Sequence, residues 1–320
     1  MPKLKEVSIE ITNKCNLKCI HCSSNAGNPF NNELSLTEIK DIIEQSRALG
    51  TAILTLSGGE PLLHPNIGEI IQYAKPLEVR LQTSGNETMD KILQAFPKTG
   101  KIVYSIHGLE STHETITGIA GSYRRAIENI RKTKEHGITA EVHIVANRLN
   151  YRQIPALEQT LQIPIHLLRL VEQGRCQTNL QLNKNQFREL QEMLLSHPNI
   201  LLGHNIDRRH LSDSSYEPLQ CQLGKDKILI RANGDIAYCA AMKHTRIGNI
   251  RDDSLDYFWN SHPFITMVRE FLSSGFRQMK GKCSKCDALN ECRGGCIAQR
   301  LQKYNDLHRG PDPLCYRKQQ

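Results

Sequence analysis

Three cysteines near the amino terminus are spaced so that they can bind one metal centre. Cys15, Cys19 and Cys22 are separated by three and then by two residues. Thiolates at this spacing can hold one face of a [4Fe–4S] cube and leave the fourth iron without a protein ligand. An open metal position is typical of a catalytic site rather than a structural one. The alternative is a zinc site whose fourth ligand comes from elsewhere, such as His21.

Seven of the other eight cysteines lie in the last 100 residues of the 320-residue chain. They are Cys221, Cys239, Cys283, Cys286, Cys292, Cys296 and Cys315. Disulfides are disfavoured, because a chain of this size does not need them and the sequence predicts a reducing compartment. Metal or cluster binding therefore explains the eleven cysteines better. A structural zinc domain is the alternative for the seven, because Cys-x2-Cys also suits zinc.

Composition limits where the protein works and what it binds. The chain has no apolar run near the ~20 residues of a membrane helix, and its first residues do not form a signal peptide, so a cytoplasmic location is predicted. The formal charge of +8 favours an acidic peptide or a nucleotide as partner. Nucleic-acid binding is disfavoured, because no basic run with interleaved aromatic residues is present.

Further polar residues follow strand-like segments. Gly58 and Gly59 would let backbone approach a ligand closely, and Glu60 can hold an ammonium group. Such residues work together only if the strands before them lie side by side. Six segments are predicted as strands, and a predicted helix lies between each strand and the next. The strands are 7–11, 52–56, 78–82, 101–105, 140–145 and 163–170. The helices between them are predicted at 35–49, 67–74, 89–96, 123–136 and 154–161, the first opened by a Ser35/Glu38 capping box.

This alternation predicts a parallel sheet with right-handed crossovers. Six units are fewer than the eight of a closed barrel, so an open, partial (β/α)6 TIM-like barrel over residues 1–185 is expected. Its ligands should lie at the carboxyl ends of the strands. Residues 186–218 are interpreted as a helix (187–195) and a linker. Residues 219–320 are interpreted as a cysteine-rich domain with a hairpin around Asn233-Gly234 and a helix at 255–271.

The cysteine loop after the first strand resembles the signature of the radical SAM superfamily. The resemblance implies that Cys15, Cys19 and Cys22 hold a [4Fe–4S] cluster whose open iron binds S-adenosylmethionine (SAM). It implies an enzyme in which an electron from the reduced cluster breaks the S–C5′ bond, and the 5′-deoxyadenosyl radical abstracts a substrate hydrogen. His21 fills the position before the third cysteine, which lies near the adenine in this family.

Other stretches look like the same family. Gly58-Gly59-Glu60-Pro61 matches its Gly-Gly-Glu motif, so Glu60 is expected at the amino group of SAM. Four residues at strand ends are further expected SAM or cavity contacts, namely Thr83, Ser84, Ser105 and Arg175. Ser84 departs from the family, which usually has Asn there. His107 stands where relatives often have Asp, and the resemblance gives it no role.

The late cysteines match the SPASM motif, the auxiliary-cluster domain of one branch of this superfamily. The resemblance implies two auxiliary iron–sulfur clusters. Cys283, Cys286, Cys292 and Cys315 would hold the outer one, and Cys221, Cys239 and Cys296 the inner one. The inner cluster then lacks a fourth cysteine. It could keep an open iron, be a [2Fe–2S] core, or take His210, Asp213 or Cys176 as ligand; Cys176 could also be a substrate-facing thiol or an ordinary buried cysteine.

SPASM relatives mostly modify peptides or proteins, so peptide maturation by crosslinking, thioether formation or side-chain oxidation is the leading hypothesis. Sulfatase maturation is disfavoured, because Ala240 follows Cys239 where such relatives carry Asp. Cys15 lies too near the start for a preceding peptide-binding domain, so a separate recognition protein is a possible partner, beside a flavodoxin- or ferredoxin-type electron donor. A radical SAM enzyme for a small anionic metabolite, such as a tetrapyrrole, is the alternative. The third hypothesis is a non-catalytic electron carrier, which Glu60 in its motif argues against.

Overall fold

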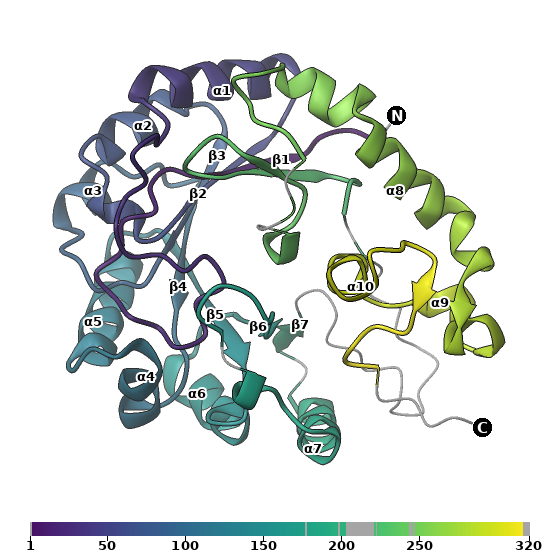
Figure 1. The fold of residues 1–320 in the computed structure, drawn as a ribbon. Helices are drawn as coiled ribbons and strands as arrows, with labels where there is room; N and C mark the ends of the chain where they lie inside the picture. Colours follow the sequence, from purple (N-terminus) through teal and green to yellow (C-terminus); the bar gives the residue numbers. More distant parts are fainter. Residues whose placement is uncertain are drawn as a thin grey trace.

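The structure is a computed structural model that describes residues 2–176, 178–197, 199–202, 221, 223–242, 245 and 247–315. Its main feature is a nine-stranded sheet in the order β7-β6-β5-β4-β3-β2-β1-β8-β9 (Figure 1). The strands are β1 (Glu6–Glu10), β2 (Ile53–Ser57), β3 (Glu78–Thr83), β4 (Lys101–Ser105), β5 (Thr139–Ala146), β6 (Ile165–Arg169), β7 (Ile200–Leu202), β8 (Lys227–Ile230) and β9 (Ile236–Ala237). All neighbours pair in parallel except β8 and β9, which form the predicted hairpin.

The helices cover the outer side of this curved sheet, as expected for an open TIM-like barrel (Figure 1). They are α1 (Leu36–Ala48), α2 (Ile67–Tyr73), α3 (Asp90–Ala95), α4 (Glu110–Thr117), α5 (Ser122–Glu135), α6 (Ile154–Leu161) and α7 (Lys184–Leu195). The six predicted strands and five predicted helices are confirmed to within a few residues. Helix α4 is an addition; its Thr and Ile residues have modest helix propensity, so the local pattern does not reveal it.

Two strands extend the predicted sheet at its edges. The apolar triplet of β7 pairs with β6, although it lies in the stretch interpreted as a linker. Strand β8 lies in the stretch assigned to the cysteine-rich domain, yet it pairs in parallel with β1, with Glu6 opposite Lys227 and Ile9 opposite Ile230. An ion pair between Glu6 and Lys227 (2.6 Å) accompanies this register. The carboxyl-terminal part therefore shares the sheet of the barrel.

Alternation along each strand separates the core from the barrel interior. Along β5, Ala140, Val142 and Ile144 belong to the hydrophobic core, whereas Glu141 and His143 are only half-buried. The Glu141 carboxylate pairs with Lys101, and one of its oxygens lies 3.5 Å from the His166 Nε2 atom. The inner side of the sheet is therefore polar at the amino ends of its strands.

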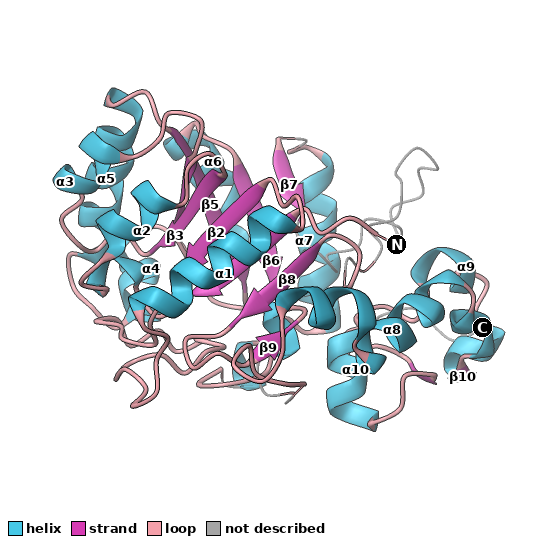
Figure 2. Ribbon diagram, turned by 90° about the horizontal axis from the view of Figure 1, so that it is seen from above, coloured by secondary structure: helices cyan, strands magenta, loops and turns pink. Residues whose placement is uncertain are grey.

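The carboxyl-terminal elements lie together beside the barrel (Figure 2). They are α8 (Pro263–Ser273), α9 (Leu289–Cys292), α10 (Ile297–Tyr304), β10 (Lys280–Gly281) and β11 (Arg309–Gly310). The single helix predicted at 255–271 is instead a π-helical turn, Tyr257–Ser261, followed by α8. The break falls at His262, because the residue before a proline avoids helical backbone. No helix in the described part of the chain is long and apolar enough to cross a membrane.

Helix α1 begins at the predicted capping box, and the same glutamate links it to a distant segment. Glu38 accepts a hydrogen bond from the Ser35 N–H (2.7 Å), the Ser35 hydroxyl accepts one from the Glu38 N–H (3.3 Å), and Glu38 also pairs with Arg251. The Arg251 hydrogen bond lowers the pKa of Glu38 to about 2. This contact joins the first helix to the segment that follows β9.

Replacing Glu38 by Gln is expected to lower the free energy of unfolding by about 1 kcal/mol at pH 7, a modest effect because the pair is partly exposed. The folded-state pKa lies below the ordinary value, so this stabilisation is present above pH 4.5 and is lost as the pH falls toward 2. Urea unfolding at pH 7 and pH 3 measures it. A difference between wild type and variant that is the same at both pH values would contradict the assignment.

Candidate SAM and iron–sulfur site

A cavity of about 290 Å³ lies where the strands of the barrel end. Its lining comes from the cysteine loop after β1 and from the segments after β2, β3, β4 and β6. The sequence-predicted residues in this lining are Cys15, Cys19, His21, Cys22, Gly58, Gly59, Thr83, Ser84, Ser105 and Arg175. The fold thus brings ten of the twelve predicted residues of this site together. The other two, Glu60 and Pro61, are buried beside it.

The three loop cysteines form one electrostatically coupled group. Burial raises the pKa of Cys19 to about 12, and the neighbouring Cys22 and Cys15 thiols add to the increase. Burial likewise raises the pKa of Cys15 to about 11. The thiols line one cavity, none is in a disulfide, and such soft donors suit an iron–sulfur cluster. The residues present therefore fit a [4Fe–4S] cluster.

The two motif glycines, Gly58 and Gly59, lie against the backbone at the start of the cysteine loop. A Cβ on Gly58 would lie 2.2 Å from the Thr12 carbonyl oxygen, and one on Gly59 would lie 2.3 Å from the Lys14 carbonyl oxygen. The Gly59 N–H donates to the Thr12 carbonyl (2.8 Å), and the Glu60 N–H donates to the Lys14 carbonyl (2.8 Å). The glycines therefore permit close approach to the backbone that leads into Cys15, as well as lining the cavity.

Glu60 is fully buried, and its carboxylate is held by residues at the end of β3 and in the loop after it. Its expected contact with the amino group of SAM stays a prediction. Its carboxylate accepts hydrogen bonds from the Thr83 hydroxyl (2.7 Å), the Ser84 N–H (2.8 Å) and the Ser84 hydroxyl (2.6 Å). Burial raises its pKa, and these hydrogen bonds oppose the increase. The structure thus shows Glu60 linking the loop after β2 to the loop after β3, while Ser84 uses its hydroxyl proton within the protein. Pro61 begins a short 3-10 turn behind this contact.

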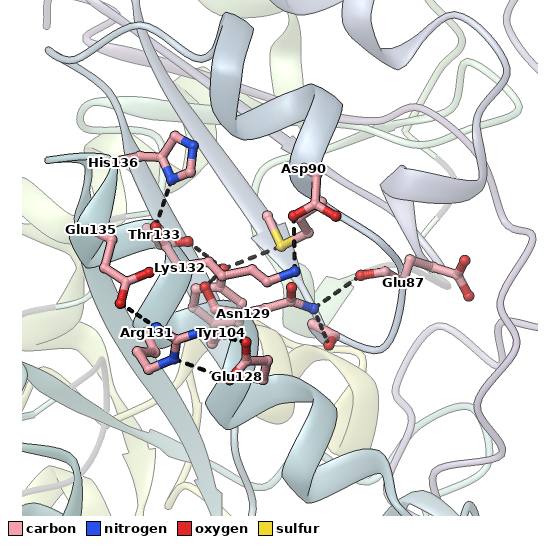
Figure 3. A network of polar contacts seen from close by, with 12 residues as sticks. Glu87, Asp90, Tyr104, Glu128, Asn129, Arg131, Lys132, Thr133, Glu135 and His136 are labelled. Atoms are coloured by element: carbon pink, nitrogen blue, oxygen red, sulfur yellow. Dashed lines mark hydrogen bonds and ion pairs between the residues drawn. The ribbon is translucent and has the colours of Figure 1, made fainter.

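Helix α5 holds the loop after β3 in place (Figure 3). The Asn129 side-chain amide donates to the carbonyls of Gly85 (2.9 Å) and Glu87 (3.0 Å). The Tyr104 hydroxyl lies 2.7 Å from the Thr133 hydroxyl and donates to the Asn129 carbonyl (3.1 Å). The loop that follows Thr83 and begins with Ser84 is therefore held by a buried network of hydrogen bonds.

Arg175 binds the backbone of the cysteine loop. Its guanidinium donates to the carbonyls of Cys19 (3.3 Å) and Ala26, and its own N–H donates to the Cys22 carbonyl (2.9 Å). A Cβ on the preceding Gly174 would lie 2.5 Å from the Cys22 carbonyl oxygen. The Arg175 charge also lowers the pKa of Cys15 and Cys19, although burial, which raises both, remains the larger effect. The structure shows a loop clamp with a cation beside the thiols.

Replacing Arg175 by Ala is expected to weaken SAM binding at least tenfold, since each hydrogen bond to a charged group contributes about 1.5–3 kcal/mol. Arg175→Lys should recover only part of the loss, because one ammonium cannot span two carbonyls. Equilibrium dialysis with SAM, together with iron analysis, measures both. Arg124→Ala is the control, because that arginine is 81% exposed and pairs with Glu110. Wild-type binding by the Arg175→Ala variant would refute the clamp.

Two buried histidines meet at the cavity wall. The rings of His21 and His107 lie edge to face with centroids 4.2 Å apart, and the Nδ1 atoms of both are buried without a hydrogen-bond partner. Burial lowers the pKa of His21 to about 4 and that of His107 well below its usual value, so both are neutral at pH 7. The backbone N–H of His107 donates to the Nδ1 atom of His113 (3.1 Å), and this hydrogen bond fixes the position of His107. His107 therefore belongs to the cavity lining, although the family resemblance implies no role for it.

The seven late cysteines divide into two groups. The Cys221 and Cys239 charges act on the pKa of Cys296, whose largest shift comes from burial. The Cys292, Cys315 and Cys286 charges act on the pKa of Cys283, again after burial. The same two groups are those that the family resemblance implies as inner and outer ligand sets, and these ligand assignments stay a prediction. The thiol-only donor sets fit iron–sulfur clusters.

Three residues are candidates for the fourth ligand of the inner auxiliary cluster, and the structure describes only one of them. His210 and Asp213 lie outside the described residues. Cys176 is half-buried, and burial together with the charge of Glu172 raises its pKa to about 11.

Sequence reasoning missed Arg169 and Asp312. Arg169 ends β6 and lines the cavity, and both of its terminal nitrogens bind the Asp312 carboxylate. The only local signal is one cation at the end of an apolar strand. Its partner lies 143 residues away, so no sequence pattern could have joined them.

Comparisons with known proteins agree with this arrangement. Residues 9–159 match the model of the radical SAM superfamily, and residues 221–287 match that of the SPASM iron–sulfur cluster-binding domain. The Fe-coproporphyrin III synthase of Methanosarcina barkeri is 25% identical over 350 aligned residues, covering 96% of this chain and 86% of the relative. The mycofactocin maturase MftC of Mycobacterium ulcerans is 27% identical over 326, with the same coverage.

Solved structures share the fold. Streptococcus suis SuiB, solved with its precursor peptide SuiA, is 20% identical with a TM-score of 0.79, over 98% of this chain and 76% of that chain. The structure of anSMEcpe with bound AdoMet is 15% identical with a TM-score of 0.71, over 96% and 93%. The chain therefore belongs to the radical SAM superfamily, as a SPASM-type enzyme whose cofactors are SAM, a [4Fe–4S] cluster and auxiliary iron–sulfur clusters.

Proposed function

We propose that this radical SAM enzyme modifies a peptide, in a reaction such as crosslinking, thioether formation or side-chain oxidation. In this proposal Cys15, Cys19 and Cys22 hold the SAM-binding cluster, and the seven late cysteines hold the auxiliary clusters. When bound, the reduced cluster and SAM supply a 5′-deoxyadenosyl radical that takes a hydrogen atom from the substrate. The chain's own residues position the cysteine loop, line the cavity and limit what can enter it.

The charge and size of the cavity carry the choice of a peptide. Arg169 is neutralised by Asp312, and Arg175 is directed to loop carbonyls beside the thiols. About 290 Å³ is at the lower end of the volumes that bind one small molecule. Within the described residues the cavity thus has room for one small molecule, which is SAM in this proposal, so a substrate would approach from outside the cavity, as a side chain of a peptide can. The mycofactocin maturases among the relatives support a peptide as well.

The second candidate is a small anionic substrate such as a tetrapyrrole. It is favoured by the Fe-coproporphyrin III synthase among the relatives and by the formal charge of +8. It is disfavoured by the same arginines, because a tetrapyrrole with several carboxylates needs cations that the protein has not already paired. The electron-carrier hypothesis is not retained, since the chain is an enzyme of the radical SAM superfamily.

The two candidates are separated by one anaerobic experiment with the reconstituted, reduced enzyme and SAM. Short peptides encoded beside its gene are supplied in one set of reactions, and a panel of tetrapyrroles with free carboxylates in the other. The proposal predicts that a peptide stimulates 5′-deoxyadenosine formation and loses hydrogen mass in mass spectrometry. Conversion of a tetrapyrrole, with every peptide unchanged, would replace the proposal by the second candidate.

A further inference from the structure

A buried ion pair connects the barrel to the carboxyl-terminal cysteine region. The Arg169 guanidinium donates two hydrogen bonds to the Asp312 carboxylate, at 2.7 and 2.6 Å. Only 7% of the Arg169 side chain and 9% of the Asp312 side chain are exposed. Arg169 stands at the end of β6 and lines the cavity, so the pair lies directly behind the cavity wall.

Asp312 also holds the backbone at one proposed cluster ligand. Its Oδ2 atom accepts a hydrogen bond from the Cys296 N–H (2.7 Å), and its Oδ1 atom accepts one from the Leu314 N–H (2.9 Å). A Cβ on Gly295 would lie 2.7 Å from the Asp312 Oδ2 atom. The turn before Cys296 is therefore shaped to bring its N–H onto this carboxylate.

The charges of the pair lie beside the proposed ligand Cys296. The Asp312 Oδ2 atom accepts a hydrogen bond from the Cys296 N–H (2.7 Å) and another from the Arg169 guanidinium (2.7 Å). Charges held this close would act on a cluster bound to Cys296, because reduction adds negative charge to a buried site.

Holding the barrel and the carboxyl-terminal region together does not by itself explain why Arg169 and Asp312 form an ion pair. Removing two charges from water is costly, and apolar residues of similar volume often hold two segments at least as firmly. An ion pair offers what an apolar contact does not, namely a fixed electrostatic field in a place that water does not screen.

We propose that the Arg169–Asp312 pair sets the reduction potential of the inner auxiliary cluster through the hydrogen bond to Cys296. Both are positioning residues, and the inference rests on the proposed assignment of Cys296 as a ligand of that cluster. It does not depend on whether the substrate is a peptide.

The test is an EPR-monitored redox titration of the full-length, reconstituted protein. Asp312→Asn leaves the Arg169 cation without its counter-charge and should move the inner-cluster potential to a less negative value. Arg169→Gln removes the cation, leaves the Asp312 carboxylate on its two backbone hydrogen bonds, and should move the potential to a more negative value. Shifts of opposite sign are the expected result. Loosened structure would move both variants the same way or broaden both signals, and either outcome, or no shift, would overturn the inference.

Control variants distinguish a failure of this inference from a failure of the assignment of Cys296 as a cluster ligand. Arg152→Gln and Glu189→Gln break another two-bonded Arg–Glu pair, which is 70% and 40% exposed and should leave the potential unchanged. Cys296→Ala should remove one auxiliary signal; an unaltered signal and iron content would refute the ligand assignment while leaving SAM cleavage untouched. If either single variant loses iron, the double variant Arg169→Leu with Asp312→Leu replaces the pair by apolar groups. Its potential should differ from that of wild type by less than the potential of the single variant that keeps its iron, and an equal or larger shift would overturn the inference.

Discussion

Replacing Cys15, Cys19 and Cys22 together by alanine is expected to reduce 5′-deoxyadenosine formation to background. The three thiols line one cavity and influence one another, so they form a single donor set, and removing it leaves SAM without its iron. The seven late cysteines belong to other groups, so their iron should remain. Iron and sulfide analysis, together with product detection under anaerobic reduction, measures both results.

The matched control is Cys176→Ala. Cys176 is half-buried like the loop cysteines, but the only cluster for which it is a candidate ligand is the inner auxiliary one, not the cluster that binds SAM. Its replacement should leave the 5′-deoxyadenosine yield close to that of wild type. Product from the triple variant would refute the catalytic assignment of the loop. Zinc in place of iron in the wild-type protein would instead support the structural alternative.

Replacing Gly59 by Ala is expected to lower cluster occupancy and SAM affinity at least tenfold. The added methyl group would lie 2.3 Å from the Lys14 carbonyl oxygen and 2.6 Å from that of Asn13, so one backbone segment must move. Overpacking of this kind costs about 1–3 kcal/mol. Here the displaced segment leads directly into Cys15, so the cost falls on the cluster site.

Gly68→Ala provides the comparison for this effect. A Cβ on Gly68 would meet no atom within 4 Å, and the residue lies inside α2. This variant should keep full iron content and gain up to ~1 kcal/mol of stability from helix propensity. Iron analysis, SAM titration and thermal unfolding compare the two variants. Equal behaviour of both would show that the close approach of Gly59 to residues 13 and 14 has no importance for the site.

Local signals were sufficient for most of the barrel. The strand predicted at 140–145 and the capping box at Ser35 rest on short-range patterns, and the structure has the strand as Thr139–Ala146 and the helix that the capping box opens as Leu36–Ala48. The edges of the sheet were not predictable in the same way. Strand β8 pairs with a strand more than 200 residues earlier, and nothing in the sequence around Lys227 indicates this partner.

The candidate site shows the same division. Cysteine spacing identified the loop, because a thiolate loop is a local motif. The direction of the Glu60 side chain was not predictable, because it depends on Thr83 and Ser84, which only the parallel pairing of β2 with β3 brings near. The contact of Arg169 with Asp312 depends on two segments that meet only in the finished fold.

The pairing of β8 with β1 has a consequence for how the protein is made. Strand β1 is synthesised long before β8, so one of its edges stays open until the chain has been synthesised beyond residue 230. An open strand edge is a site where other chains can add and aggregate. A fragment that ends after the predicted barrel, at residue 185, would keep that edge exposed permanently. The barrel and the cysteine-rich region are therefore best expressed together, because the late segment completes the sheet that the first segment begins.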